Sequence, residues 1–582
     1  MKLKHLIYSL VLLSLVFTAC DLDPQVENTF GDDSTWSFPD YAEGVLLNAY
    51  AAIPSRFNNY DSNFLDVATD NAVTNDYSSN IYEVATGGIN PNFNPIGNWN
   101  SAYDQFRNIH LFLENGLGEN VIYNISDEVA DQQYRDRLKG EAYYLRAWWG
   151  FQLLQEFGGK TATGKALGYP IVTETLTGAE LENVKDISRN TYEECVERII
   201  ADIDTAMVYL PQKYSGGSNI TGTTGLGRAD DQVALALKSR LLLYAASPAY
   251  QDDDITKLNG MGFFSVVDEE EYTRKWIASA SAAQEALDLV GNVNGLDEGQ
   301  FTDNNTPNEF IWRKYHNDRV LESDNFPPLD YGKGYTSPSQ NLVNSFPAKN
   351  GYPIDSPEAN YDPEAPYANR DPRLELNVLY NGENVLGDPL ETFVGGRDSK
   401  EKNYSATRTG YYVRKWLALE DLLDPNNLSS QHHYYVLFRK TELLLNFAEA
   451  SNEAFGPLGI GEGNSMSALE AMKMIRKNAG INNQDYITSV AESGTNEFRN
   501  LIQNERRIEL SFENHRFFDM RRWLLPLDED VNGVRITKTG ADSFSFEEYK
   551  VEERPFHQLR DYYLPIPYDE QIKSDLINNL GW

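Results

Sequence analysis

Apolar residues recur every three or four positions over several long stretches of the chain, and this period predicts amphipathic α-helices. In residues 131–157, Leu138, Leu145 and Trp149 follow the spacing, and further aromatic residues lie beside them. We therefore expect this helix to be buried on several sides and to end at Gly158. The predicted helices cover residues 99–115, 131–157, 190–210, 229–247, 270–290, 432–455, 466–479 and 496–523.

These helices form four successive helix-turn-helix pairs that are similar to tetratricopeptide repeat units. Between them lie long irregular stretches rich in Asn, Gly, Pro and Tyr, at residues 54–98, 212–228, 250–268, 291–430 and 524–565. Loops of this length inside a compact chain are usually functional. We therefore predict a mainly α fold, in which four tetratricopeptide-like helix pairs form a scaffold and a large irregular, loop-rich lobe provides the binding surface.

Composition narrows the classes of ligand. The 582 residues include 87 acidic and 50 basic side chains, which gives a formal net charge of −37. A protein that binds nucleic acid needs clustered Lys and Arg, so this charge argues against nucleic acid as a partner. It also disfavours uronate-rich or sulfated ligands, unless the binding site itself is basic.

The N-terminus has the features of an export signal. Residues 1–19 combine two lysines with an apolar run that is too short to span a membrane, so we predict a signal peptide. Small residues precede Cys20, as in the lipobox of bacterial lipoproteins, and we predict that Cys20 is lipidated and that residues 20–30 form a tether. Ordinary cleavage with a free Cys20 is the alternative. The remaining cysteine, Cys195, lies in a helical pattern and is expected to be a buried thiol.

One predicted helix carries three carboxylates that resemble catalytic acids. Glu505, Glu509 and Glu513 are four residues apart, so they share one face. Arginines flank them, and we therefore expect structural ion pairs instead of catalysis. The partners available on the same helix are Arg506, Arg507, Arg521 and Arg522. The sequence also lacks the Gly-x-Ser-x-Gly motif that carries the nucleophile of α/β-hydrolases. No catalytic residue is therefore predicted.

Metal-binding patterns are weak. His432 and His433 are adjacent and cannot share a helical face, and no zinc motif occurs. Asp528, Asp530 and Asn532 match the first half of a calcium loop, but the bidentate acid at the twelfth position is missing. We expect no cofactor, with Ca²⁺ at these three residues as an alternative to a simple polar turn.

Several short motifs follow one another between residues 99 and 567. They include Trp99-Asn-Ser-Ala-Tyr103, Gly140-Glu-Ala-Tyr-Tyr-Leu-Arg-Ala-Trp148, Arg370-Asp-Pro-Arg373, Glu505-Arg506, Arg516-Phe-Phe-Asp519 and Leu564-Pro-Ile-Pro567. Together, and behind a lipobox, this order resembles the SusD/RagB family of nutrient-uptake lipoproteins. Asn514-His515 departs from the glycine that the family most often has after its glutamate.

The resemblance implies a single body at residues 31–582, with an N-terminal part at about 31–290 and a C-terminal part at about 291–582. It implies a non-enzymatic protein on the outside of the outer membrane that captures an oligosaccharide for a SusC-type TonB-dependent transporter. A peptide-binding branch similar to RagB is the first alternative. A secreted hydrolase is the second.

A sugar site needs aromatic faces for C–H surfaces and polar groups for hydroxyls. The loops at residues 61–98 and 312–335 supply both kinds of side chain, at roughly the places where family members bind ligands. Arg370 is a further candidate, with a loop-fixing role as its alternative, whereas Trp99 and Trp148 are expected in the core. The candidate ligand-binding residues are Asp70, Asp76, Tyr77, Asn94, Trp312, Tyr331 and Arg370.

Overall fold

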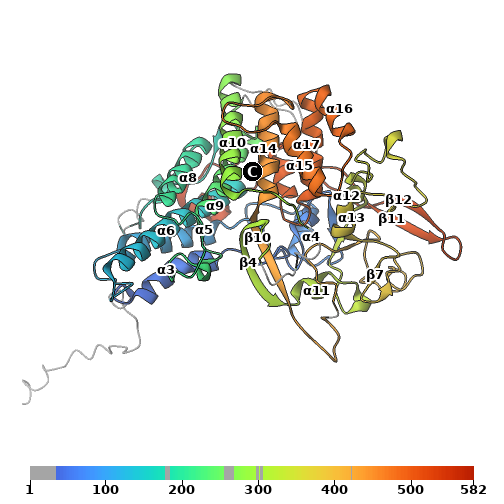
Figure 1. Cartoon of the computed structure of the whole chain (residues 1–582), viewed down its shortest axis with the longest axis horizontal. Helices are drawn as coiled ribbons and strands as arrows, with labels where there is room; N and C mark the ends of the chain where they lie inside the picture. Colours follow the sequence, from blue (N-terminus) through green and yellow to red (C-terminus); the bar gives the residue numbers. More distant parts are fainter. Residues whose placement is uncertain are drawn as a thin grey trace, which may run out of the picture.

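The computed structural model of the chain describes residues 35–176, 178, 184–253, 268–296, 301, 306–420 and 422–582. Helices predominate over strands, as predicted (Figure 1). The larger helices are α3 (Pro39–Ala51), α5 (Trp99–Leu111), α6 (Glu128–Phe157), α8 (Tyr192–Met207), α9 (Asp231–Ala246), α10 (Glu269–Val290), α14 (Lys440–Phe455), α15 (Ala468–Asn478), α16 (Asp485–Ser493) and α17 (Thr495–Glu509). Shorter helices are α4 (Asn80–Ala85), α11 (Val320–Asn325), α12 (Gln340–Ser345), α13 (Pro372–Asn377), α18 (Arg516–Arg522) and α19 (Tyr568–Ser574).

The larger helices stack in chain order. Helix α5 packs between α3 and α6, α8 between α6 and α9, and α10 between α9 and α14 (Figure 1). Helix α14 in turn contacts α15 and α17. The pairs α3/α5, α6/α8, α9/α10 and α14/α15 therefore form the scaffold, which confirms the fold class. Helix α3, which the sequence pattern did not predict, completes the first pair.

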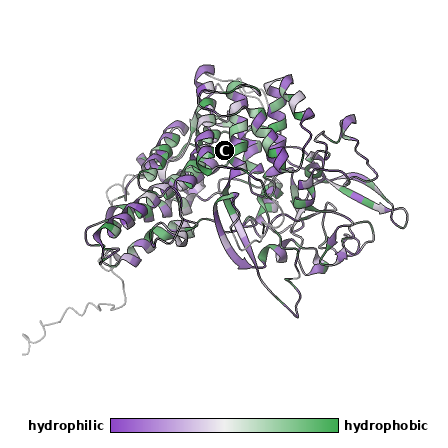
Figure 2. Cartoon of the chain, viewed as in Figure 1, coloured by the Kyte–Doolittle hydropathy of each residue, from purple (hydrophilic) through white to green (hydrophobic). Residues whose placement is uncertain are grey.

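Side-chain caps define where several helices begin. Thr191 and Glu194 form a capping box at the start of α8, and the Asp127 carboxylate accepts hydrogen bonds from two backbone N–H groups of α6. Figure 2 shows hydrophilic and hydrophobic residues alternating along the helical ribbons. Most of the apolar sides meet in a large hydrophobic core, which extends from Leu46 to Leu576 in the described residues, and a smaller cluster around Trp276 joins α9, α10 and α14.

The strands form small two-stranded antiparallel sheets. The two longest paired strands correct the predicted start of one helix. Strand β10 (Gln431–Arg439) pairs with β4 (Phe310–Asp318), so the helix predicted at 432–455 begins only at Lys440. The segment 431–439 is rich in aromatic and β-branched residues, which favour a strand once a partner is present. The other pairs are β1 (Ala72–Thr74) with β5 (Thr336–Pro338), β2 (Gly159–Lys160) with β3 (Ala166–Leu167), β6 (Val378–Leu379) with β9 (Tyr412–Val413), β7 (Asn384–Val385) with β8 (Asp388–Pro389), and β11 (Val531–Lys538) with β12 (Phe544–Glu552).

The helix predicted at 496–523 is also interrupted. Helix α17 ends at Glu509, and α18 begins at Arg516. Between them, Phe512 and Asn514 have φ angles of 58° and 63°. This left-handed conformation cannot continue a right-handed helix, so the chain turns here.

A buried set of charges lies at the end of α17. We call it the Arg439 network, and it comprises Arg373, Lys415, Arg439, Glu505, Glu509 and Glu513. The Arg439 guanidinium lies 2.8 Å from a Glu509 oxygen and 2.9 Å from a Glu513 oxygen. Arg373 lies 2.8 Å from the other Glu509 oxygen, and Lys415 lies 2.8 Å from Glu513. The expected ion pairs are thus confirmed, but their partners come from distant segments and not from the same helix.

The residues expected in the core are buried. Trp99, Trp148 and Cys195 all lie inside, and burial raises the pKa of the Cys195 thiol to about 12, which makes it unreactive. In the described part of the chain, no helix combines the length and the apolarity that crossing a membrane requires. The predicted signal peptide, Cys20 and tether lie outside the described residues.

Replacing one partner in the Arg439 network should destabilise the fold. Glu509→Gln leaves the Arg439 charge buried with one carboxylate fewer, and we expect a loss of about 3 kcal/mol in the free energy of unfolding. Urea unfolding at pH 7 measures this loss of stability. Glu492→Gln, at an exposed glutamate on α16, is the matched control and should change stability by less than about 0.5 kcal/mol. Equal effects of the two substitutions would contradict the structural role of the network.

The same carboxylate should make stability depend on acid pH. Burial alone would raise the pKa of Glu509, but the Arg439 and Arg373 guanidiniums outweigh it and lower this pKa from 4.5 to about 2. Its stabilising contribution is therefore complete above pH 4.5 and is lost as the pH falls toward 2, because the unfolded chain takes up the proton first. Urea midpoints at pH 7, 5, 4 and 3 should show wild type and Glu509→Gln converging below pH 4.5. A constant difference over this range would refute the linkage.

Candidate functional site

An exposed group of tyrosines lies where three loops of the irregular lobe meet. Tyr77, Tyr331 and Tyr404 are exposed to 46%, 60% and 77%, and the Lys400 ammonium lies near the faces of Tyr77 and Tyr404. We call Tyr77, Lys400 and Tyr404, together with the exposed Tyr331 on the adjoining loop, the tyrosine surface. Tyr77 follows strand β1, Tyr331 precedes strand β5, and Lys400 and Tyr404 belong to the loop before β9.

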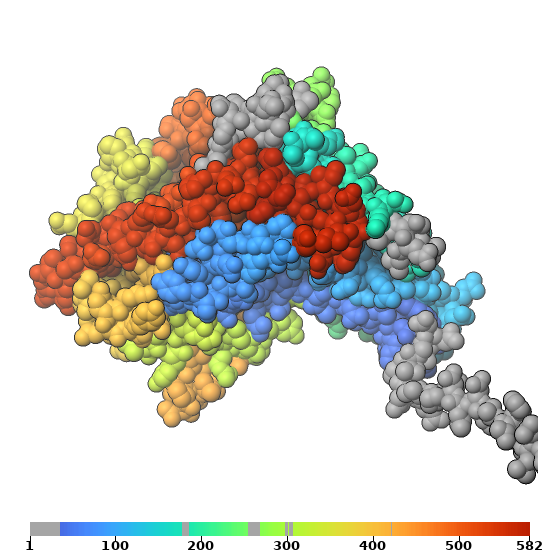
Figure 3. Space-filling view, turned by 180° about the vertical axis from the view of Figure 1, so that it is seen from behind, coloured from blue at the N-terminus to red at the C-terminus, as the bar shows by residue number. Residues whose placement is uncertain are grey.

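Asn75 joins the three loops. Its backbone N–H donates to the carbonyl of Tyr335 at 3.0 Å, and its side-chain amide donates to the carbonyls of Lys333 at 3.0 Å and Ser405 at 2.7 Å. The antiparallel pairing of β1 with β5 also holds the loop of Tyr77 beside the loop of Tyr331. In Figure 3 the blue N-terminal segment accordingly lies beside both the red C-terminal segment and the gold segment near residue 400.

Two cations flank the ring of Tyr77. The Arg408 guanidinium lies 4.8 Å from the ring centroid, donates to the carbonyl of Thr74 at 2.8 Å, and pairs with the buried Glu552 carboxylate at 2.6 Å. The Lys400 ammonium lies 5.9 Å from the Tyr77 centroid and 5.4 Å from that of Tyr404. These contacts hold the Tyr77 ring, which is 46% exposed, at the surface.

Asp70, a predicted ligand-binding residue, instead supports this surface from inside. Its buried carboxylate lies 3.0 Å from Arg507 and 2.9 Å from Arg516. Burial alone would raise the pKa of Asp70, but these two guanidiniums lower it well below its usual value. Asp70 therefore remains charged and ties the segment before β1 to α17 and α18, and it presents no group to a ligand.

Trp312 and Arg370 also lie in the interior, which corrects their prediction as ligand contacts. Trp312 is 1% exposed, donates its indole N–H to the carbonyl of Gly227 at 2.8 Å, and packs edge-on against Trp148. The Arg370 guanidinium donates to three backbone carbonyls, including that of Val343 at 2.6 Å. Its alternative, a loop-fixing role, is the one that its contacts support.

The two remaining candidates, Asp76 and Asn94, differ in their position relative to the tyrosine surface. Asp76 lies beside Tyr77, and one carboxylate oxygen accepts from the backbone and the hydroxyl of Ser78. Asn94 accepts a hydrogen bond from the Ile96 N–H at 3.3 Å in the loop before α5. None of its contacts in the described residues joins it to the tyrosine surface.

The segment that matches the first half of a calcium loop has a different geometry. Asn532 lies inside strand β11, and not in a loop, while Asp528 approaches His557 and Asp530 approaches Lys550. Among the described residues, no group of three His, Cys, Asp or Glu side chains could hold a metal ion. The contacts of these three residues give no support to calcium, which was the alternative to a polar turn.

Sequence reasoning missed Lys400 and Tyr404. Both lie in the irregular stretch 291–430, which has no period to orient its side chains. The sequence feature that could have identified them is a basic and an aromatic residue close together in a polar loop. Many other loops in this chain have the same feature, so it is not specific.

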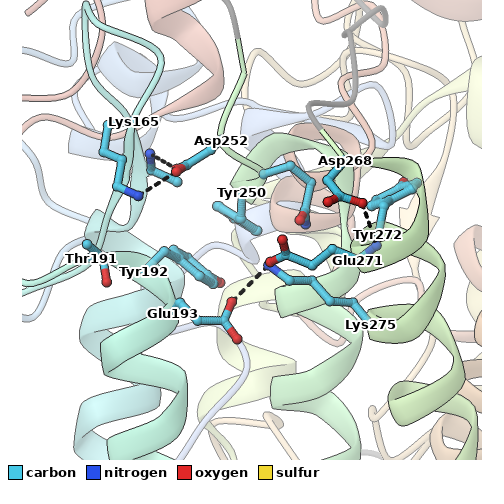
Figure 4. Close-up of a pocket in the computed structure, with 12 residues that line it drawn as sticks. Lys165, Thr191, Tyr192, Glu193, Tyr250, Asp252, Asp268, Glu271, Tyr272 and Lys275 are labelled. Atoms are coloured by element: carbon cyan, nitrogen blue, oxygen red, sulfur yellow. Dashed lines mark hydrogen bonds and ion pairs between the residues drawn. The ribbon is translucent and has the colours of Figure 1, made fainter.

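A separate cavity of about 360 Å³ lies between the first turns of α8 and α10 (Figure 4). Tyr192 and Tyr250 stack at its floor with their centroids 4.7 Å apart. Its rim charges pair with one another, since the Lys165 ammonium lies 2.5 Å from Asp252 and the Lys275 ammonium 2.8 Å from Glu193. These lysines are already neutralised, in contrast to Lys400.

Comparisons with known proteins agree with the motifs. Residues 300–582 match a family model described as the SusD family, and residues 22–241 match one described as "Starch-binding associating with outer membrane". Of two SusD-like proteins from Formosa agariphila, one is 31% identical over 176 residues, which are 29% of this chain and 30% of that protein's length. The other is 22% identical over 516 residues, which are 83% of this chain and 79% of that protein.

Solved structures share the fold. A SusD-like protein from Bacteroides fragilis NCTC 9343 has a TM-score of 0.71 at 23% identity, covering 95% of this chain and 99% of that one. A SusD-like carbohydrate-binding protein from the same organism has a TM-score of 0.69 at 20% identity, covering 93% and 99%. A laminarin-binding SusD-like protein has a TM-score of 0.55 at 17% identity, covering 94% and 99%. With the two family models covering most of its length, the chain belongs to the SusD/RagB family.

Proposed function

We propose that the protein is a lipid-anchored glycan-binding protein of the outer-membrane exterior, which captures an oligosaccharide on the tyrosine surface and delivers it to a SusC-type TonB-dependent transporter. Family membership supports the class, because solved relatives include carbohydrate-binding and laminarin-binding proteins. One matching model is also described as associating with the outer membrane.

The observation that carries the proposal is the exposure of three tyrosines on loops that the scaffold holds in place. Exposed tyrosines on adjoining loops suit recognition, because a tyrosine combines an apolar ring face, which fits the C–H surface of a sugar ring, with a polar hydroxyl. Asp76 and the tyrosine hydroxyls then supply hydrogen-bond partners for sugar hydroxyls. Capture needs no catalytic group, so the protein binds its ligand and does not cleave it.

Removing an exposed ring should weaken binding. We expect Tyr77→Ala and Tyr404→Ala each to lower affinity for the bound glycan about tenfold, because each removes one stacking face. Titration calorimetry against a glycan panel measures the change. Tyr41→Ala on α3 is the matched control, since Tyr41 is 47% exposed and lies outside the irregular lobe.

Three outcomes would count against this function. If Tyr77→Ala and Tyr404→Ala bind as the wild type does, the ligand does not use the tyrosine surface. If peptides bind and glycans do not, the protein belongs to the peptide-capturing alternative. Release of reducing sugar by the purified protein would establish a hydrolase.

The lipid anchor has its own test. Cys20→Ser should abolish incorporation of labelled palmitate and release the protein from the membrane fraction, because the thiol is the acceptor of the lipid. Cys195→Ser, at the buried thiol, should retain both the label and the membrane association. Unchanged labelling of Cys20→Ser would contradict the anchor.

A further inference from the structure

Lys400 is the cation of the tyrosine surface, and it lies near two aromatic rings. Among the described residues it forms no ion pair, although the chain carries 87 acidic side chains. The exposed Lys402 forms no ion pair with a described carboxylate either, but three other cations on the adjoining loops are paired. Lys333 lies 3.1 Å from Asp324, Arg397 lies 2.9 Å from Asp398, and Arg408 lies 2.6 Å from Glu552.

The surroundings of Lys400 favour an incoming anion. The side chain is half-buried between the rings of Tyr77 and Tyr404. Burial, and then the nearby Arg408 charge, lower the pKa of its ammonium, which means that the cation is poorly solvated and repelled from one side. An oxyanion placed beside it would relieve both costs.

Nearby carboxylates do not satisfy this ammonium. Asp76 directs one oxygen to Ser78, and the exposed Glu401, which follows Lys400 in sequence, forms no ion pair with it. In a protein of net charge −37, an anionic glycan is repelled by most of the exterior. A local, unpaired cation at the binding surface is the feature that would overcome this repulsion.

We propose that Lys400 binds an anionic substituent of the glycan, either a uronate carboxylate or a sulfate ester, while Tyr77 and Tyr404 cover the sugar rings on either side. The inference rests on the proposed function and adds the charge class of the ligand. Both substituents offer the same chemistry, an oxyanion within reach of an ammonium.

Titration calorimetry with three probes tests the inference on the full chain. The probes are oligogalacturonate for carboxylate, carrageenan oligosaccharide for sulfate, and maltohexaose as a neutral glycan. We expect the wild type to bind one anionic probe, and Lys400→Met to weaken that binding about tenfold or more. Lys400→Arg keeps the charge and should restore affinity to within about threefold. Lys402→Met, at an exposed lysine two residues away, is the matched control and should bind as the wild type does.

Salt provides a second measurement. The affinity of the wild type for the anionic probe should fall as salt rises, and Lys400→Met should reduce this dependence. The two anionic probes identify whether carboxylate or sulfate is the bound group. Circular dichroism should show that all three lysine variants keep the wild-type fold, because Lys400 and Lys402 lie outside the hydrophobic core.

The outcomes separate this inference from the proposed function. Wild-type affinity of Lys400→Met for the anionic probe, or binding of maltohexaose alone, would overturn the role of Lys400 while leaving glycan capture intact. Tyr77→Ala should weaken every probe that binds, whereas Lys400→Met should weaken only the anionic one. Failure of the wild type to bind any glycan, in these probes or in the wider panel, would overturn both proposals.

Discussion

The architecture depends on charges that are buried together at the end of α17. Arg439 reaches both Glu509 and Glu513, and Arg373 and Lys415 occupy the remaining carboxylate oxygens. An unpaired charge in the interior costs several kcal/mol, so each of these groups can be buried only with the others in place. The segments that carry them are far apart in the sequence. The network therefore fixes how the C-terminal helices, strand β10 and the irregular lobe fit together.

A second set of ion pairs fixes the segments that carry the tyrosine surface. Arg507, on the same helix, holds Asp70, and Asp70 precedes the strand that positions Tyr77. On the other side, Glu552 pairs with Arg408, which lies against the Tyr77 ring. A recognition surface built on loops needs such support, because loose side chains would lose conformational entropy on binding. The buried ions thus make an irregular lobe rigid enough to present aromatic faces.

Local sequence patterns predicted the helices well, because a 3.6-residue period is a property of neighbouring residues. They failed where residues that are distant in the sequence determine the local structure. Residues 431–439 form a strand because β4 lies beside them, and the helix predicted at 496–523 breaks where Phe512 and Asn514 turn left-handed. The glutamates of α17 were correctly predicted to form ion pairs. Their partners Arg373 and Arg439 could not be identified, since nothing in the local spacing brings them near.

The same distinction explains the site. The two predicted loops do supply Tyr77 and Tyr331, but Trp312 from one of them is buried, because an aromatic residue in an irregular segment fits a core as readily as a surface. What separates Trp312 from Tyr404 is the partner of its polar atom. The Trp312 indole N–H donates to a backbone carbonyl in the interior, whereas the exposed ring of Tyr404 lies beside an ammonium that pairs with no described carboxylate. Ligand chemistry in this fold therefore lies in the loop residues that the ion pairs leave unpaired, and those residues can vary without disturbing the scaffold.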